Sequence, residues 1–155
     1  MKKYILFITV VFMTSFAFAQ SNKEEVDLIQ AAFGMDKKAA LAEFIQLSDT
    51  QKDAFWKLYD EYESQRKELG KQRIAGLEQY AAQYKTMTGE QADAWTKKAM
   101  DLQKKTDNLI ATYYTKVLKI SDGIVATQFY QFENYVLIAI RAQVLSEIPF
   151  VEKKQ

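Results

Sequence analysis

Apolar and aromatic residues recur every three or four positions between Leu47 and Met87, a stretch without proline. The residues in this register are Phe55, Tyr59, Tyr62, Arg66, Leu69, Arg73, Leu77, Tyr80 and Tyr84. Such spacing places all of them on one face of a helix. The pattern therefore predicts a single amphipathic helix, which at 1.5 Å per residue would be about 60 Å long.

Two further long helices follow from the same kind of spacing. From Thr88 onward, steps of three and four residues form a narrow seam typical of a coiled coil. This seam consists of Ala92, Trp95, Ala99, Leu102, Thr106, Leu109, Tyr113 and Val117. A third helix follows Ile120, and we expect Pro149 to end it. Because this third helix is apolar around most of its circumference, we expect it to be the most buried one.

The third helix has two apolar sides. One side carries Val125, Phe129, Phe132, Val136, Ala139 and Ile140, and the other carries Tyr135, Ile138, Ala142 and Leu145. Ahead of the long helices, Asn22 and Glu25 form a plausible capping box for a short helix that Gly34 would close. Asp36 would cap a second short helix that runs to about Ile45.

The first residues have the pattern of a signal peptide. Lys2 and Lys3 precede an apolar run from Tyr4 to Phe16, and Ala17-Phe18-Ala19 fits the cleavage rule. We therefore expect residues 1–19 to be removed, which leaves a mature chain of 136 of the 155 residues, starting at Gln20. The alternative, an uncleaved anchor, is disfavoured because the run is shorter than the ~20 residues a span needs. No later segment is apolar enough to cross a membrane.

The predicted fold is all-α, with residues 20–155 forming a single helical domain. It consists of a long antiparallel helical hairpin, a third long helix and a short helical lead-in. A compact globule of this length has a radius of gyration near 14 Å, which is too small to enclose a helix of about 60 Å. Either the long helices bend near Gly70 or Gly76, or the protein is elongated and buries its seam between two copies, and of these we expect the elongated dimer.

Composition excludes several classes of function. Two of the 21 basic residues lie in the predicted signal peptide, so 19 remain against 20 acidic ones, and the mature chain has a formal charge of −1. Neither a basic stripe for nucleic acid nor an acidic tail is present at this balance. The chain has no cysteine and no histidine. It therefore lacks disulfides and the commonest general base and metal ligand.

Two similar pentapeptides mark the starts of the first two long helices. They are Leu47-Ser48-x-x-Gln51 and Met87-Thr88-x-x-Gln91, in which a hydroxyl and a glutamine three residues later can form a capping box. The repeated motif, behind a signal peptide in a helical chain of this size, resembles the two LTxxQ motifs of the Spy/CpxP family of periplasmic stress proteins. Serine replaces threonine in the first copy, and methionine replaces leucine in the second.

The resemblance covers the chain from about Phe44 to Ala142. It implies an elongated helical hairpin wrapped by further helices and dimerised into a curved cradle in the periplasm. Members of the family include an ATP-independent chaperone, an inhibitor of a sensor kinase and metal-responsive proteins. Metal-responsive members rely on histidine-rich segments, which are absent here, so we expect no metal ion and no cofactor.

Candidate residues for client binding lie along the first long helix. Tyrosine combines a large apolar face with a hydrogen-bonding tip, which suits a surface that meets many partners. The candidates are Tyr59, Tyr62, Arg66, Lys67, Arg73, Tyr80 and Tyr84. The alternative is structural: most rings belong to the core or a dimer seam, and Arg66 and Arg73 pair with acids such as Glu133 on the third helix.

No catalytic set, phosphate-binding loop or zinc spacing is present, so we do not expect an enzyme. The sequence favours an exported binding protein, most simply an ATP-independent periplasmic chaperone that holds unfolded or aggregation-prone exported proteins. The alternative is an envelope-stress regulatory module that docks on one partner, such as a sensor kinase. Secretion is the alternative to a periplasmic location.

Overall fold

The computed structural model of the protein describes residues 23–151, with side chains from Phe33 onward. These residues form helices and no strand, so the all-α prediction is confirmed. The predicted signal peptide lies outside the described residues. The helices are α2 (Lys23–Phe44), α3 (Asp49–Gln83), α4 (Gly89–Ile120) and α5 (Gly123–Glu147).

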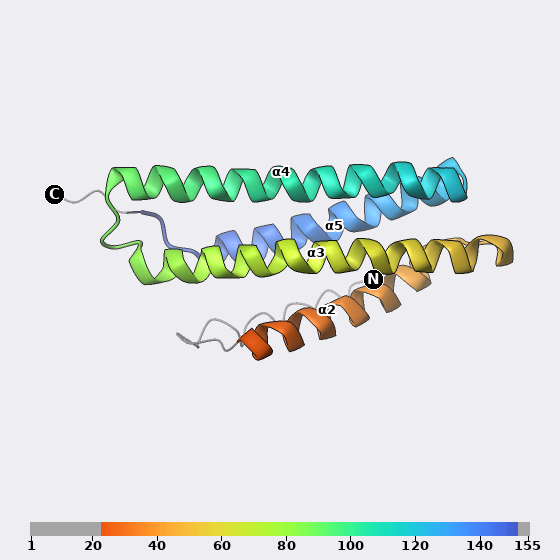
Figure 1. The fold of residues 1–155 in the computed structure, drawn as a ribbon, viewed down its shortest axis with the longest axis horizontal. Helices are drawn as coiled ribbons and strands as arrows, with labels where there is room; N and C mark the ends of the chain where they lie inside the picture. The colour runs from red at the N-terminus through yellow and green to blue at the C-terminus, as the bar shows by residue number, and fades with distance from the viewer. Residues whose placement is uncertain (1–22, 152–155) are drawn as a thin grey trace.

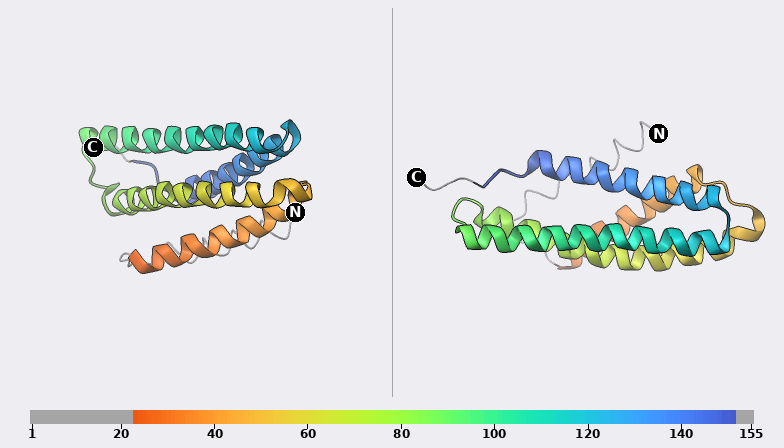
Figure 2. Two further views of the ribbon diagram at one scale, coloured as in Figure 1. Left: turned by 45° about the vertical axis from the view of Figure 1, so that its right-hand side comes forward. Right: turned by 90° about the horizontal axis from the view of Figure 1, so that it is seen from above.

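The two longest helices form the frame of the bundle. Figure 1 shows α3 and α4 alongside each other and running in opposite directions, with α5 behind them. Figure 2 shows that α5 stands on one side of the layer formed by α3 and α4. Helix α2 packs on α3 and, less extensively, on α5. The 35 residues of α3 make a rod about 50 Å long, which gives the described part of the chain an elongated shape.

The ends of the long helices agree with the sequence-based prediction because they depend on local chemistry. Ser48 and Thr88 are the N-caps of α3 and α4. The N-cap of α5 is Asp122, whose carboxylate accepts hydrogen bonds from the backbone N–H groups of Ile124 and Val125. Helix α5 ends at Ile148, which is held in an extended conformation by the following Pro149.

The lead-in differs from the prediction, because one helix replaces the two short ones expected there. Helix α2 runs through Gly34 and Asp36 without a break. Gly34 lies where α2 approaches α3, and a Cβ atom at this position would stand only 3.2 Å from Glu63 Oε2. The glycine therefore permits close packing of two helices and does not end one.

The core is shared among all four helices. Its fully buried side chains include Leu41 of α2, Phe55, Tyr59 and Tyr62 of α3, Ile110, Tyr113 and Val117 of α4, and Val125 and Phe129 of α5. The face predicted for α3 points inward, since its first two tyrosines and Tyr80 are buried. Aromatic rings therefore fill most of the space between the long helices.

Helix α5 has the largest share of buried residues among the three long helices, as predicted: six of its 25 residues are buried, against five of 35 in α3 and five of 32 in α4. Its inner side packs in the core, but its opposite side is exposed, because the neighbouring helices cover only part of its circumference. Four large side chains there, from Ile124 to Leu145, have 55–71% of their surface exposed. Within the described residues, no helix is long and apolar enough to cross a membrane.

Candidate functional site

The cap motif at Thr88 forms the reciprocal hydrogen bonds that its sequence predicts. The Gln91 N–H donates to the Thr88 hydroxyl at 3.2 Å, and the Thr88 N–H donates to the Gln91 side-chain oxygen at 2.9 Å. Met87, which precedes the cap, is buried. Two otherwise unpaired N–H groups of the first turn are thus satisfied.

The motif at Ser48 has the same arrangement with a looser hydroxyl contact. The Ser48 N–H donates to the Gln51 side-chain oxygen at 3.0 Å. The Ser48 hydroxyl, however, lies 3.1 Å from the Thr50 hydroxyl and forms no hydrogen bond of normal geometry with the Gln51 N–H. Leu47 packs against the core. Both motifs therefore cap the N-terminal ends of helices, and neither presents a reactive group.

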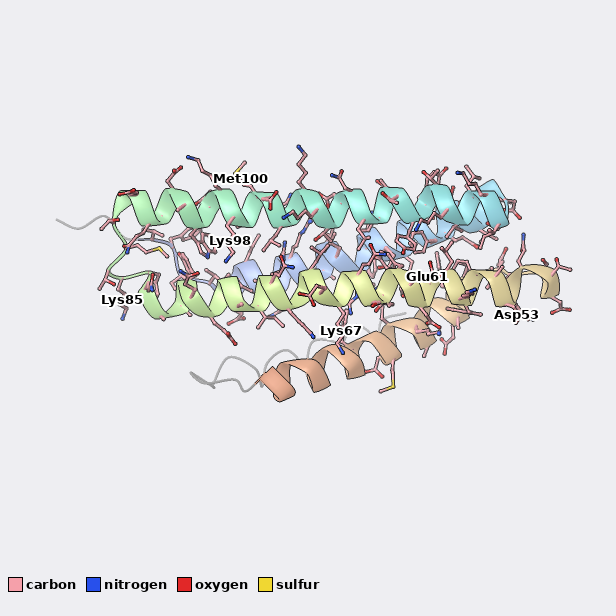
Figure 3. The ribbon with its side chains drawn as sticks, in the orientation of Figure 1. Asp53, Glu61, Lys67, Lys85, Lys98 and Met100 are labelled. Carbon is pink, nitrogen blue, oxygen red and sulfur yellow. The ribbon has the colours of Figure 1, made fainter. Side chains whose placement is uncertain are left out.

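The seven candidate client-binding residues do not form one exposed surface. Tyr59, Tyr62 and Tyr80 have at most 4% of their surface exposed. The other four, Arg66, Lys67, Arg73 and Tyr84, are half-buried. Figure 3 shows Lys67 on the side of α3 that is next to α2 in that view. This face of α3 packs against its own bundle, so Tyr59, Tyr62 and Tyr80 are unavailable to a partner in this structure.

Two of these tyrosines belong to a buried polar network that joins three helices. The Glu133 carboxylate of α5 accepts hydrogen bonds from the Tyr59 hydroxyl at 3.0 Å and the Tyr62 hydroxyl at 2.7 Å. It also pairs with Lys37 of α2, whose Nζ lies 2.8 Å away. The Lys37 and Glu133 side chains are 1% and 2% exposed. The carboxylate is therefore paired with a cation and almost completely removed from water.

A second carboxylate completes the network. Glu63 pairs with Lys37 and receives the Arg66 guanidinium, whose Nε lies 3.0 Å from both carboxylate oxygens. Arg66 also stacks over the ring of Phe33, 5.0 Å from its centre. Arg66 thus contacts an acid as expected, but that acid is Glu63 on its own helix. The cation that binds Glu133 is Lys37.

The network perturbs the phenols inside it. Burial, and then the negative charge of Glu133, raise the pKa values of Tyr59 and Tyr62 well above the ordinary value of a phenol. Both hydroxyls therefore remain protonated donors at neutral pH. Two acids and two cations balance one another here, which indicates a structural role in fixing how α2, α3 and α5 pack.

The exposed side of α5 is the most unusual surface among the described residues. We define the outer strip of α5 as Ile124, Thr127, Gln131, Tyr135, Ile138, Ala142 and Leu145, all of which are exposed. Ile124, Gln131, Ile138 and Leu145 follow one another at intervals of seven residues, which keeps them on one line along the helix. The strip covers 21 residue steps, or about 30 Å.

The outer strip also lacks charge. No exposed residue of α5 before Glu147 is acidic or basic. The only charged side chains earlier in the helix are the buried Glu133 and Arg141, which pairs with Asp107 of α4 at 2.9 Å. The outer sides of α3 and α4, in contrast, carry ion pairs such as Lys97–Asp93. An uncharged apolar line among charged helices indicates a contact surface.

The sequence contained signals for both the buried polar network and the outer strip of α5. Lys37 is four residues from Phe33 and from Leu41, so it lies within the apolar stripe of α2 and should be buried. Tyr135, Ile138, Ala142 and Leu145 were recognised as a second apolar side of α5. The sequence did not indicate that neighbouring helices would cover only one of the two sides.

Metal binding finds no support in the described residues, where no group of three or more carboxylates could hold an ion. Comparisons of the chain with models of protein families, with curated proteins and with solved structures find no match. The resemblance to the Spy/CpxP family therefore depends on the two cap motifs and the helical pattern alone.

Proposed function

We propose that this protein is an exported, ATP-independent chaperone that holds unfolded or aggregation-prone proteins on a helical surface. The observation that carries the proposal is the outer strip of α5, an uncharged apolar line on an otherwise charged bundle. Unfolded proteins expose apolar side chains without a fixed shape, and a straight strip without charge can accept many of them.

The size of the strip fits weak and reversible binding. Ile124, Tyr135, Ile138 and Leu145 are 55–71% exposed. Burying each of them against a client would contribute roughly 1–2 kcal/mol, or about 4–8 kcal/mol in total before the cost of association. A net energy of about 4–8 kcal/mol would correspond to affinities from millimolar to micromolar, so after the cost of association is subtracted the strip of one chain alone binds at the weak end of this range or below it. Such affinities suit a protein that captures clients and releases them without ATP.

Two further parts of the proposal come from the sequence. The signal peptide and the resemblance to the Spy/CpxP family support a periplasmic location, with secretion as the alternative. A homodimer, arranged as an elongated cradle around the helical hairpin, would widen the apolar surface beyond that of one α5 helix. Sedimentation velocity tests this dimer. The expected mass at micromolar concentration is about twice that of the mature chain.

A regulatory module that docks on one envelope partner is the second candidate. The spacing of seven residues between Ile124, Gln131, Ile138 and Leu145 favours it, because this spacing suits a single partner helix. The two candidates differ in specificity. A dedicated regulator should recognise one shape, whereas a chaperone should bind unrelated unfolded chains.

The deciding experiment is suppression of aggregation by the mature protein, without ATP, for two unrelated clients that aggregate at different rates. The chaperone proposal predicts that light scattering decreases for both clients at stoichiometric ratios. A regulator should protect neither client. Since the outer strip is uncharged, protection should also change little between low and physiological salt.

A further inference from the structure

A cleft opens between α3, α4 and α5 near the end of α5. It has a volume of about 130 Å³, and its apolar lining includes Leu77, Trp95, Leu102, Val144 and Ile148. A second cavity of about 90 Å³ shares Arg73, Leu77 and Val144 with it and extends along the inner side of α5 as far as Glu133. The two cavities are therefore neighbours on the inner side of α5.

The charges around the cleft have one sign. Arg73, Lys98 and Arg141 line it, and no acidic residue does. Figure 3 shows Lys98 on the side of α4 that faces α3, whereas Met100 points away from the bundle. Asp107 is the nearby acid, and it binds one nitrogen of Arg141 from outside the lining at 2.9 Å. The cleft therefore combines apolar walls with an excess of positive charge.

The two guanidinium groups at the cleft have fewer partners than they could bind, since Asp107 contacts one nitrogen of Arg141 only. Arg73 is half-buried and forms no hydrogen bond or ion pair with any residue of the described chain. The Nε atom of Arg141 is buried without a hydrogen-bond partner among the same residues. Burial, and then the charge of Arg141, lower the pKa of Arg73. Asp107 pairs with Arg141 and also acts on Arg73, so one acid faces two half-buried cations and one positive charge is left over.

We propose that this cleft binds a single-chain carboxylate amphiphile of the fatty-acid class. The carboxylate would pair with the Arg73 guanidinium. It would also supply the hydrogen-bond acceptor that the Nε–H of Arg141 lacks. The alkyl chain would lie along Leu77, Trp95 and Val144. Apolar walls with a few convergent polar groups at one place are typical of sites for such ligands.

The lining favours an alkyl chain over a peptide. A peptide backbone would bring several N–H donors into the cleft, where the charged side chains are donors themselves and Gln103 is the one lining side chain that could accept a hydrogen bond. An alkyl chain has no such requirement, and a carboxylate provides only acceptors. The site is also distinct from the outer strip of α5, with which it shares only Leu145.

Trp95 provides a direct readout, because it lines the cleft and its Nε1 donates to the Gly76 carbonyl at 2.9 Å. In a Trp56→Phe background, Trp95 is the only tryptophan of the chain. Dodecanoate, titrated below its micelle concentration, should change its fluorescence in a saturable manner. Acetate should have no effect, and dodecyltrimethylammonium should bind about tenfold or more weakly. Calorimetry with the unmodified mature protein should give a stoichiometry of one dodecanoate per chain.

The variant Arg73→Met separates binding from folding, because it keeps the apolar stem and removes the unpaired charge. It should weaken dodecanoate binding about tenfold or more, yet leave the unfolding midpoint of the free protein unchanged or higher. The control Lys104→Gln removes an exposed charge of α4 and should change neither quantity.

Three results would overturn the proposal. The first is equal binding of dodecanoate by the Arg73→Met variant and the parent protein. The second is equal affinity for dodecanoate and the cationic amphiphile, which would reveal apolar adsorption without recognition of the carboxylate. The third is binding of an apolar peptide in the cleft when dodecanoate fails to bind.

Discussion

Replacing Lys37 by methionine tests the buried network that joins α2, α3 and α5. The substitution keeps the length and apolar character of the side chain but removes its charge. Glu133, which is 2% exposed, then loses its ion pair with Lys37 but keeps two tyrosine donors. Glu63 keeps Arg66. The variant therefore leaves one buried carboxylate without this ion pair.

The expected loss of stability follows from this geometry. Removing one partner of a buried ion pair costs about 3–5 kcal/mol, because the remaining charge stays away from water. The tyrosine hydrogen bonds to Glu133 are retained, so we expect a value near the lower end, about 3 kcal/mol. With a urea m-value of roughly 1.5–2 kcal/mol/M, the unfolding midpoint should decrease by about 1.5–2 M.

The assay is urea unfolding of the mature protein, followed by circular dichroism. The double variant Lys37→Met/Glu133→Gln removes both charges and should recover most of the lost stability. Lys97→Met, which breaks an exposed pair with Asp93, is the matched control and should change the midpoint little. A Lys37→Met midpoint equal to that of the parent, or a double variant less stable than the single one, would refute the role assigned to the network.

Three further predictions concern helix ends, helix packing and pH. Thr88→Ala should lower the free energy of unfolding by about 1 kcal/mol, because the threonine hydroxyl accepts a backbone N–H. Ser48→Ala should lower it by less, because the serine hydroxyl lacks this hydrogen bond. Equal urea midpoints for the two variants would contradict this. Gly76→Ala should stabilise α3 by about 0.5–1 kcal/mol because its Cβ has open space, whereas Gly34→Ala should be destabilising because its Cβ meets Glu63; thermal melts compare the two. The pKa of Tyr62 is raised in the folded state, so the contribution of this phenol to stability is complete below pH about 10 and is lost as the pH rises further. The absorbance change of the ionising phenol near 295 nm should therefore coincide with unfolding.

Much of the fold was predictable because helix starts and ends depend on neighbouring residues. Ser48, Thr88 and Pro149 mark boundaries through hydrogen bonds and steric limits that act within a few residues. Gly34 was misread because its reason lies 29 positions away, in the approach of α2 to Glu63. Local sequence cannot distinguish a glycine that ends a helix from one that allows two helices to approach.

The candidate site was less predictable than the fold. Periodicity showed that α3 has one apolar face and that α5 has two, but not how many neighbours each face would meet. The α3 face, with Tyr59 and Tyr62, meets α4 and α5 and is buried. The outer strip of α5 meets no described helix. The number of covering helices, which is a property of the whole fold, therefore decides which tyrosines and isoleucines can reach a partner.

The most direct test of the central claim compares two double variants in the aggregation assay with both clients. Ile124→Gln/Ile138→Gln makes the outer strip polar, whereas Met35→Gln/Met100→Gln makes two equally exposed apolar positions outside the strip polar. We predict that the parent protein and the methionine variant protect both clients and that the isoleucine variant loses most protection while its unfolding midpoint stays unchanged. Full protection by the isoleucine variant, or no protection by the parent protein, would contradict the account.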